Sequence, residues 1–429
     1  MNDSSRLADF LTHSITAYHF VEYARPLLLS HGYTEIKEGK FPREFNNRAF
    51  WVRDGRTLIA YDSSEAFDSA VIVAAHDDSP HIKLKNRMNT SVDCVELADA
   101  GLYAGGLSYS WYGRDLKVGG CIVYKENENI MMKIVQTDKA IATIPFPSVS
   151  LNPDENSGLI FETNRNVNLN LMVGIKGTST VLKYLCDIYG LDIDNVLSYN
   201  LEFVDSRPAT VNGDMVISGR LDDLASAYGV LYGFLNSKAN NTLNVLAVYD
   251  NEEIGSRTRT GALGNSLDIT LRYICNSKNV DYLKLKSKTF FANCDAAHSQ
   301  HPNYEQIGEC KHQLPVGSGV GIKTATKISY AFDDFGYYFM QEVAKRANVP
   351  YKLLIGKNGP SGGGTIGPKI EKSLGISVTD IGPGNYSMHS CREMMSWKDA
   401  EAQVKLISYL LNNYKELREY VYNEIEKQK

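Results

Sequence analysis

Two neighbouring glutamates at the end of a predicted buried strand are the most chemically informative feature of the chain. The stretch NVLAVYDNEEIGS covers residues 244–256, and its apolar run, residues 245–249, is typical of a strand covered on both faces. Glu252 and Glu253 follow the carboxyl end of this run, where ligands bind in open α/β sheets. One carboxylate could hold a metal ion while its neighbour handles a proton. Taken alone, two solvated acids in a turn explain this stretch equally well.

A histidine and two aspartates follow a second predicted buried strand, SAVIVAA at residues 69–75. His76 could bind a metal ion, and an aspartate beside it could orient the imidazole ring and raise its basicity. Asp77 and Asp78 both stand close enough in sequence, and the spacing of two places Asp78 on the side of His76. A His-Asp turn that only caps the strand is the alternative.

Further acids and a histidine stand where other predicted elements begin or end. Asp222 begins a helix whose apolar residues recur at helical spacing, so a helix N-cap is the competing interpretation. The predicted strand 289–293 leads to Asp295, and the predicted strand 376–381 leads through a Gly/Pro turn to His389. Mixed nitrogen and oxygen ligands at one sheet edge suit two zinc-like ions bridged by a carboxylate. Such a pair commonly clamps a water nucleophile and the oxygen of the bond it attacks.

The remaining elements indicate an α/β protein with an insertion. Helical spacing covers residues 5–30, a hairpin is predicted around Asp54-Gly55, and residues 400–426 form a long amphipathic helix. Residues 88–208 are polar and strand-rich and contain no cluster of histidines and acids. We therefore expect a catalytic domain, residues 1–87 and 209–429, and an inserted domain that makes subunit contacts and covers the site.

Composition narrows the class of protein. With 429 residues, 43% of them hydrophobic and 22% charged, the chain is typical of a soluble globular protein with two domains. A net charge of -5 gives no electrostatic argument for nucleic acid, and no apolar run is long enough to span a membrane. The N-terminus lacks the pattern of a signal peptide, and seven scattered cysteines without a CxxC pair favour reduced thiols. We expect a cytoplasmic protein.

Six motifs in order resemble the signatures of one known family. They are AAHDDSP, SGRLDDLAS, YDNEEIGS, NCDAAHSQHPNY, GGGTIGP and MHSCREM, and they extend from residue 74 to residue 394. The chain thereby resembles the aspartyl aminopeptidase and aminopeptidase I family of dinuclear zinc metallopeptidases. The resemblance implies a three-layer αβα sandwich with a central mixed sheet and an inserted, β-rich dimerisation domain. It also implies dimers that assemble into a hollow tetrahedral homododecamer.

The same resemblance assigns roles to the site residues. It implies that His76 and Asp295 hold one ion, that Glu253 and His389 hold the other, and that Asp222 bridges them. Asp78 would orient His76, and Glu252 would be the general base that deprotonates the bridging water. Zn²⁺ is the expected metal, with Co²⁺ or Mn²⁺ as alternatives, and peptides are the expected substrates.

A cis peptide bond is expected between Asp222 and Asp223. Asp222 has to place both carboxylate oxygens between two ions at the start of a helix. Related dinuclear peptidases have such a bond after their bridging aspartate. A cis bond before a residue other than proline costs about 3 kcal/mol, so it persists only where its surroundings hold it.

The identity of the preferred N-terminal residue rests on fewer positions. Lys323 and Tyr330 match positions that line the P1 pocket of aspartyl aminopeptidases, which predicts a preference for Asp or Glu. A solvated surface lysine is the alternative, and a preference for neutral residues such as Leu would follow from it. Gly364, in the triple glycine 362–364, would let the backbone approach the substrate. Ser150 stands where animal members have a histidine that reaches a neighbouring subunit's site, so another group would have to replace it.

Two other classes compete with this function. A related dinuclear hydrolase, a deacetylase or carboxypeptidase, would share the ligands but would need a cationic clamp for a terminal carboxylate. A non-catalytic oligomeric scaffold that binds cargo could also retain the fold, although metal binding alone would not require Glu252. His298 and His301 are expected to support the site or the fold.

Overall fold

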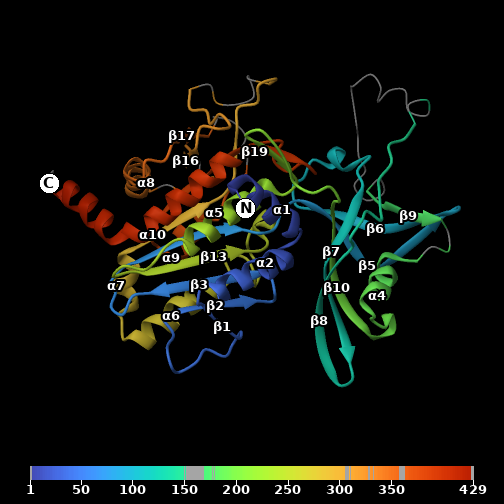
Figure 1. Cartoon of the computed structure of the whole chain (residues 1–429), viewed down its shortest axis with the longest axis horizontal. Helices are drawn as coiled ribbons and strands as arrows, with labels where there is room; N and C mark the ends of the chain where they lie inside the picture. The colour runs from blue at the N-terminus through green and yellow to red at the C-terminus, as the bar shows by residue number, and fades with distance from the viewer. Residues whose placement is uncertain are drawn as a thin grey trace.

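The structure is a computed structural model of the chain. It describes residues 2–148, 150, 169–175, 177, 179–304, 309, 311–326, 329–331, 333–356 and 363–426. Helices and strands alternate along most of this length. The strands form two sheets, which lie side by side in Figure 1.

A large mixed sheet organises most of the chain. Within the described residues it has 13 strands, and its central part runs in the order β3-β13-β4-β14-β18. The pairs β13–β4, β4–β14 and β14–β18 are parallel, whereas β13–β3 and β16–β18 are antiparallel. The strands of the main path are β1 (Thr34–Ile36), β2 (Arg48–Arg53), β3 (Thr57–Ser63), β13 (Leu243–Tyr249), β4 (Ala70–His76), β14 (Thr289–Cys294), β18 (Ser377–Tyr386), β19 (Glu393–Ser396), β12 (Met215–Ser218) and β11 (Thr210–Asn212). Three more join off this path: β15 (Ala297–His298), β16 (Val320–Thr324) and β17 (Tyr351–Ile355).

Helices cover both faces of this sheet. Alternate residues of β4 belong to different hydrophobic clusters: Val71 and Val73 pack with the helices of one face, and Ala70 and Ile72 with those of the other. The first face carries α1 (Asp3–His13), α2 (Ala17–Ser30), α5 (Leu221–Leu235), α8 (Asp334–Arg346) and α10 (Trp397–Glu426). The second face carries α6 (Ser266–Lys278), α7 (Tyr282–Ser287) and α9 (Gly367–Leu374). The expected three-layer αβα sandwich with a central mixed sheet is confirmed.

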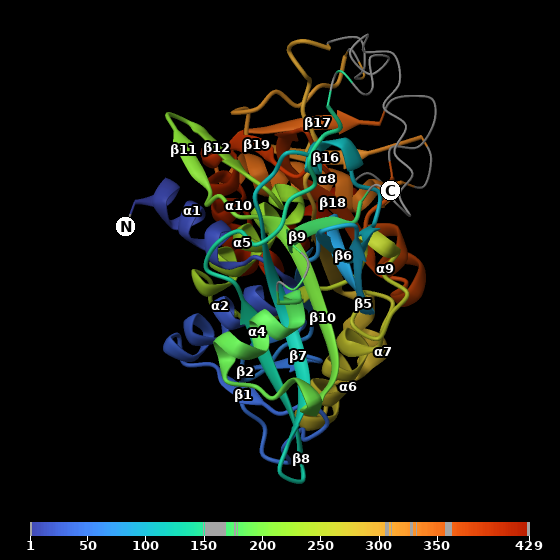
Figure 2. The ribbon, with the colours of Figure 1, turned by 90° about the vertical axis from the view of Figure 1, so that its right-hand side faces the viewer.

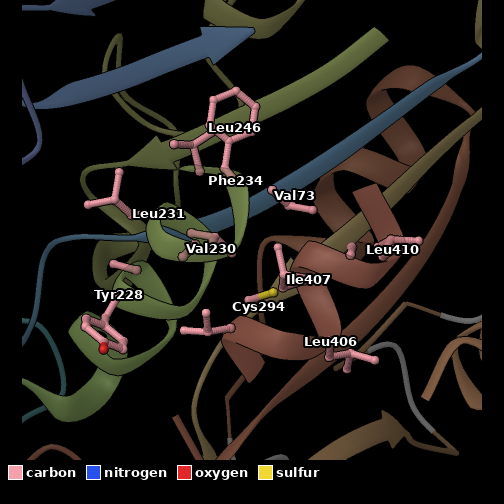
Figure 3. Packing of buried hydrophobic residues seen from close by; sticks show 14 of the residues in the cluster. Val73, Tyr228, Val230, Leu231, Phe234, Leu246, Cys294, Leu406, Ile407 and Leu410 are labelled. Carbon is pink, nitrogen blue, oxygen red and sulfur yellow. The ribbon is translucent and has the colours of Figure 1, made fainter. Parts of the chain in front are cut away.

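The core explains why the central strands are apolar throughout. Every residue of β4, β13 and β14 is buried, as expected for strands covered on both faces. Figure 3 shows side chains of α5 and α10, among them Phe234 and Ile407, packed over these strands. Polar residues therefore gather where the strands end, and the site forms there.

Local details confirm one expectation and correct two. The hairpin β2–β3 turns at Asp54 and Gly55, whose φ angles of 52° and 72° match the left-handed turn that this pair favours. The helical stretch at the N-terminus breaks into α1 and α2 around Ser14, which caps α1. The predicted Gly/Pro turn after residue 381 is wrong: β18 continues to Tyr386, because β15 and β16 pair with its 381–385 segment.

Within the described part of the chain, a second sheet of six strands lies beside the first. Its order is β8-β7-β10-β5-β6-β9, and every pair is antiparallel. In Figure 2 the second sheet faces the viewer, and its long strands β7 and β10 lie next to each other. The strands are β5 (His81–Val92), β6 (Val95–Tyr103), β7 (Leu116–Glu126), β8 (Asn129–Gln136), β9 (Leu171–Ile175) and β10 (Val196–Asp205), with the helix α4 (Val181–Tyr189). Short 3₁₀ helices are η1 (Ser108–Trp111), η2 (Ile193–Asn195) and η3 (Glu252–Ile254).

This second sheet has a hydrophobic core of its own, which also takes in Cys391 from the loop before β19. The sheet extends from residue 81 to residue 205, and the boundaries 88–208 of an inserted dimerisation domain remain a prediction. Among the described helices, none is both long and apolar enough to cross a membrane. The six cysteines within the described residues are free thiols.

Candidate metal centre

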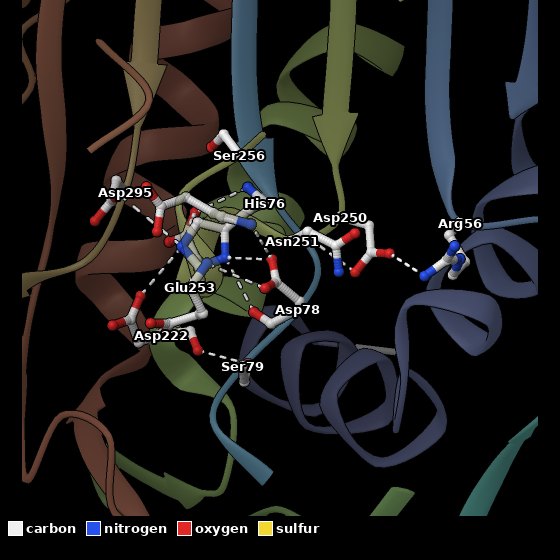
Figure 4. A network of polar contacts seen from close by, with 12 residues as sticks. Arg56, His76, Asp78, Ser79, Asp222, Asp250, Asn251, Glu253, Ser256 and Asp295 are labelled. Carbon is white, nitrogen blue, oxygen red and sulfur yellow. Dashed lines mark hydrogen bonds and ion pairs between the residues drawn. The ribbon is translucent and has the colours of Figure 1, made fainter. Parts of the chain in front are cut away.

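The predicted site residues converge at the carboxyl edge of the large sheet. His76 ends β4, Asp222 begins α5, Glu253 lies in η3 after β13, and Asp295 follows β14 directly. His389 lies in the loop between β18 and β19. Figure 4 shows His76, Asp222, Glu253 and Asp295 pointing toward a common centre. Four separate segments of the large sheet and one helix therefore build this site.

Asp222 lies between the two histidines. Its Oδ1 is 3.5 Å from His76 Nε2, and its Oδ2 is 3.1 Å from His389 Nε2. The peptide bond between Asp222 and Asp223 is cis, as predicted. The two carboxylate oxygens thus face different imidazoles, which is the arrangement that a bridging carboxylate requires.

Each of the two remaining candidate ligands lies near one of these histidines. Asp295 Oδ2 lies 4.0 Å from His76 Nε2, and Glu253 Oε1 lies 3.2 Å from His389 Nε2. Donor atoms of His76, Asp222 and Glu253 all lie within 4.8 Å of one another. Donor atoms this close to one another can bind a shared metal ion.

Asp78 holds His76 in the orientation that a metal ligand needs. His76 Nδ1 lies 3.0 Å from the main-chain oxygen of Asp78 and 3.3 Å from its Oδ1. Because these partners accept hydrogen bonds, Nδ1 carries the proton and the Nε2 lone pair faces the site. The carboxylate of Asp78 also accepts hydrogen bonds from the backbone N–H groups of Glu252 and Glu253, at 2.9 and 3.1 Å.

The electrostatics of the site favour bound cations. Burial raises the pKa of Glu253 to about 8, with further repulsion from Asp222, against the opposing attraction of His389. Burial also disfavours ionised Asp222, but the attraction of His389 and His76 outweighs it and lowers the pKa of Asp222. For His389, burial is outweighed by Asp222 and Glu253, which raise its pKa to about 11. The buried acids around both histidines therefore favour a positive charge at this centre, which a bound cation supplies without a proton on either Nε2.

The donor set fits divalent metal ions. Asp222 Oδ1 and Glu253 Oε1 are buried, and no described group donates a hydrogen bond to either of them. A buried carboxylate oxygen without a donor is costly, and a coordinated cation removes that cost. Imidazole nitrogen with carboxylate oxygen is a ligand set that zinc accepts.

Glu252 lies beside this centre on the same short 3₁₀ helix as Glu253. Its side chain is 8% exposed, and burial together with Asp295 raises its pKa, while His76 and Lys369 oppose the shift. Lys369 Nζ donates a hydrogen bond to Glu252 Oε1 at 2.6 Å. A carboxylate held next to the candidate ligands can exchange a proton with a water bound among them.

Lys323 is buried rather than solvated, with 1% of its side chain exposed. Its Nζ donates to the main-chain oxygen of Ala296 at 2.8 Å and to Asp295 Oδ1 at 3.3 Å, and it lies 5.3 Å from the ring centroid of Tyr330. Burial alone would lower the pKa of Lys323, but Asp295 and Tyr330 raise it above its usual value, so the side chain stays charged. The surface-lysine interpretation is wrong.

Four predicted residues remain, namely Gly364, Ser150, His298 and His301. Gly364 is exposed, and a Cβ placed there would lie 3.5 Å from the main-chain oxygen of Ser329. Ser150 is also exposed, and residues 149 and 151–168 on either side of it lie outside the described part of the chain. His298 is the last residue of β15, and His301 packs its ring against Tyr386.

Three supporting residues were not predicted from the sequence. Glu393 accepts hydrogen bonds from the backbone N–H groups of His389 and Asp222, at 2.8 and 2.9 Å. Asp223 accepts from the backbone N–H groups of His76 and Ala296, at 3.3 and 3.0 Å.

Tyr103, from β6 of the second sheet, donates to Asp78 Oδ2 at 2.8 Å. For Glu393 and Asp223, the position inside a motif was the available signal. Tyr103 had none, because its partner belongs to another sheet.

Comparisons with known proteins identify the family of this chain. The family model described as aminopeptidase I zinc metalloprotease (M18) matches residues 10–410. A probable M18 family aminopeptidase 2 of Clostridium novyi is 29% identical, over 95% of this chain and 98% of the relative. Aspartyl aminopeptidase 1 of Schizosaccharomyces pombe is 28% identical, over 96% and 95% respectively.

A solved structure supports the same assignment. It is described as the cryo-EM structure of the Ape4 and Nbr1 complex, and a chain in it is 27% identical to this protein. The two superpose with a TM-score of 0.92, covering 98% of this chain and 87% of that one. With its six motifs, its fold and the M18 match over nearly its whole length, the chain belongs to the aminopeptidase I family of zinc metalloproteases and is a metallo-aminopeptidase.

Proposed function

We propose that this aminopeptidase removes N-terminal Asp or Glu residues from peptides, using two divalent ions and Glu252 as the general base. The observation that carries the two-ion proposal is the placement of Asp222, whose two oxygens face different histidines at 3.5 and 3.1 Å. In this proposal His76 and Asp295 would hold one ion, Glu253 and His389 would hold the other, and Asp222 would bridge them. Zn²⁺ is the proposed metal, with Co²⁺ and Mn²⁺ as alternatives.

The residues divide the proposed reaction into a few steps. The bound ions would supply Lewis-acid activation of a water and of the scissile carbonyl. Glu252 takes a proton from the attacking water as the water oxygen bonds to the carbonyl carbon, and returns it to the leaving nitrogen as the C–N bond breaks. The carboxylates around the centre attract the free α-ammonium group of the substrate, which restricts cleavage to the N-terminus.

One assay separates this function from its competitors. The purified protein is incubated with aspartyl-, glutamyl- and leucyl-p-nitroanilide, with and without a chelator, and with a carboxypeptidase substrate. We expect release from the aminoacyl anilides, loss with chelator and recovery on adding Zn²⁺. Absence of release with every substrate, despite bound metal, would favour the non-catalytic scaffold. Release only from the carboxypeptidase substrate would favour that hydrolase.

Two observations support the acidic preference. A relative that the chain matches over 96% of its length is named an aspartyl aminopeptidase. Lys323 is a buried ammonium close to the candidate ligand Asp295. The contact with Asp295 also limits the effect, because a neutral substrate does not leave Lys323 without a partner. We therefore expect a preference of about tenfold, equivalent to about 1.4 kcal/mol, rather than the larger penalty of an unpaired buried charge.

The variant Lys323→Met tests this preference. We expect kcat/KM for aspartyl-p-nitroanilide to fall about tenfold more than kcat/KM for leucyl-p-nitroanilide. Lys352→Met, on the neighbouring strand β17, is the matched control and should change kcat/KM for neither substrate. A wild type that cleaves the leucyl substrate faster would assign the chain to the neutral-preferring alternative.

We also propose that the protein forms a homo-oligomer, as dimers that build a dodecamer, through the second sheet. The edge strand β8 supports this part of the proposal: its first five residues are exposed and include Ile130 and Met131. An exposed apolar edge strand is a template for pairing with another chain. The domain boundaries, residues 1–87 with 209–429 for the catalytic domain and 88–208 for the inserted domain, belong to the same proposal.

The cysteines that the structure describes are free thiols, which supports a reducing, cytoplasmic location.

A further inference from the structure

Lys369 makes a close contact with the proposed general base. Its Nζ lies 2.6 Å from Glu252 Oε1 and 3.2 Å from Ser256 Oγ, so the ammonium bridges two residues of the segment that follows β13. Lys369 is 24% exposed and Glu252 is 8% exposed. At this burial an ion pair is screened less than on the open surface, and its geometry is better defined.

The backbone around Lys369 is held firmly against the sheet. Lys369 lies in the first turn of α9, next to Pro368. A Cβ at Gly367 would collide with the carboxylate of Asp380 in β18, so the helix begins in direct contact with that strand. Thr365 donates to the same carboxylate at 2.6 Å. The lysine therefore extends from a fixed point, and its reach determines where its ammonium group can lie.

Glu252 is anchored at two points by residues of different elements. Its backbone N–H donates to Asp78 Oδ1 at 2.9 Å, and its side chain accepts from Lys369. A glutamate side chain has three rotatable bonds, so the backbone contact alone does not determine where the carboxylate lies. Because Lys369 binds Oε1, the other oxygen, Oε2, remains available to accept a proton.

We propose that Lys369 is a positioning residue for Glu252: it holds one carboxylate oxygen so that the other meets the proton of the attacking water. This inference rests on the proposed function, in which Glu252 is the general base. Lys369 itself contacts neither the candidate ligands nor the reacting atoms. Its effect is therefore on the rate of the chemical step, because a displacement of about 1 Å in a reacting group can cost roughly 100-fold in rate.

The test compares Lys369→Met, Lys369→Arg and the control Lys372→Met. Lys372 lies on the same short helix and is exposed, so its replacement removes an equal charge without touching Glu252. For Lys369→Met we expect kcat to fall about 10- to 100-fold, with KM within about threefold of wild type and with unchanged zinc content. Lys369→Arg should recover at least part of the lost kcat, and Lys372→Met should match wild type.

A double variant and a crystal structure make the test specific. If Lys369 acts through Glu252, adding Lys369→Met to Glu252→Gln should lower kcat no further, because the two changes affect one step. A crystal structure of Lys369→Met should show the Glu252 carboxylate displaced from its position in the wild type.

Several results would overturn the inference. A rise in KM that accounts for the whole loss would make Lys369 a substrate contact. Loss of zinc would make its role structural, and an effect equal to that of Lys372→Met would leave it no role. If the wild type releases no N-terminal residue, the proposed function fails. The crystal structure of Lys369→Met then decides the positioning role, and an unmoved Glu252 carboxylate rejects it.

Discussion

The two sheets of this protein differ in how they are buried and in what they contribute to the site. All residues of β4 and β13 in the large sheet are buried, whereas β8 in the second sheet is largely exposed and the first half of β10 is exposed or half-buried. All five candidate ligands belong to the large-sheet region. Strands buried on both faces leave their ends as the places for polar side chains, so the chemistry collects there.

The second sheet contributes placement instead of ligands. Tyr103 donates to Asp78, and the backbone N–H of Leu107 donates to the main-chain oxygen of His389 at 2.9 Å. Ser110 Oγ accepts a hydrogen bond from the backbone N–H of Cys391 at 2.9 Å. Two ligand-bearing loops of the large sheet are thus held by β6 of the second sheet and by the connection from β6 to β7. A region without a candidate metal ligand therefore helps to position the residues of the metal centre.

The largest effect should come from the large sheet. Glu252→Gln removes the proposed base but leaves the candidate ligands in place, so we expect kcat to fall by a factor on the order of 100 or more. Metal content measured by mass spectrometry should remain as in wild type. Glu65→Gln, an exposed change in the same region, is the control. Near-normal turnover of the Gln variant would remove Glu252 from the mechanism.

A smaller effect should come from the second sheet. Tyr103→Phe removes one hydrogen bond to Asp78 and keeps the ring, so we expect zinc affinity or kcat/KM to fall about tenfold, the low end for partners of metal-binding histidines. Tyr109→Phe removes an exposed hydroxyl from the same region and should have no effect. If both phenylalanine variants behave like wild type, the second sheet does not support the site through this contact.

A substitution in the second sheet should change the assembly of the protein without changing its catalytic chemistry directly. Ile130→Lys places a charge on the exposed edge strand β8, and we expect a smaller particle by light scattering. Leu283→Lys is a matched control on α7, because the two side chains are 72% and 74% exposed. An Ile130→Lys protein with the mass of the wild-type assembly would exclude this edge from the interface.

The smallest effect concerns the boundary between the sheets. His19 in α2 contacts the second sheet near Gly119, and burial, with Lys117 and Arg220 nearby, lowers its pKa to about 3. The unfolded chain takes up a proton at this histidine below about pH 6.5, while the folded chain does not, so folding becomes less favourable as the pH falls.

Denaturant unfolding at two pH values measures this contribution. From pH 8 to pH 6, wild type should lose about 1 kcal/mol more stability than His19→Gln. The variant His31→Gln, at the exposed end of the same helix, should behave like wild type. Equal losses in wild type and His19→Gln would mean that folding does not lower the pKa of His19.

The residues at the ends of the buried strands can be predicted from the sequence. Runs such as 69–75 and 245–249 are apolar because both faces are covered, and the first polar residues after them include His76 and Glu252. These signals are local, so they can be recognised without knowing the fold. The predicted turn after residue 381 failed because β15 and β16, distant in sequence, pair with that segment and keep it extended.

The groups that contact those residues follow from the packing of distant elements and cannot be predicted from local sequence. Lys369 and Glu252 are 117 residues apart, Tyr103 and Asp78 are 25 apart, and Lys323 and Asp295 are 28 apart. Nothing in the local pattern around a lysine or a tyrosine says whether it is solvated or paired with a buried carboxylate. That choice follows from which elements pack together, because a buried charge is stable only where the fold brings it a partner.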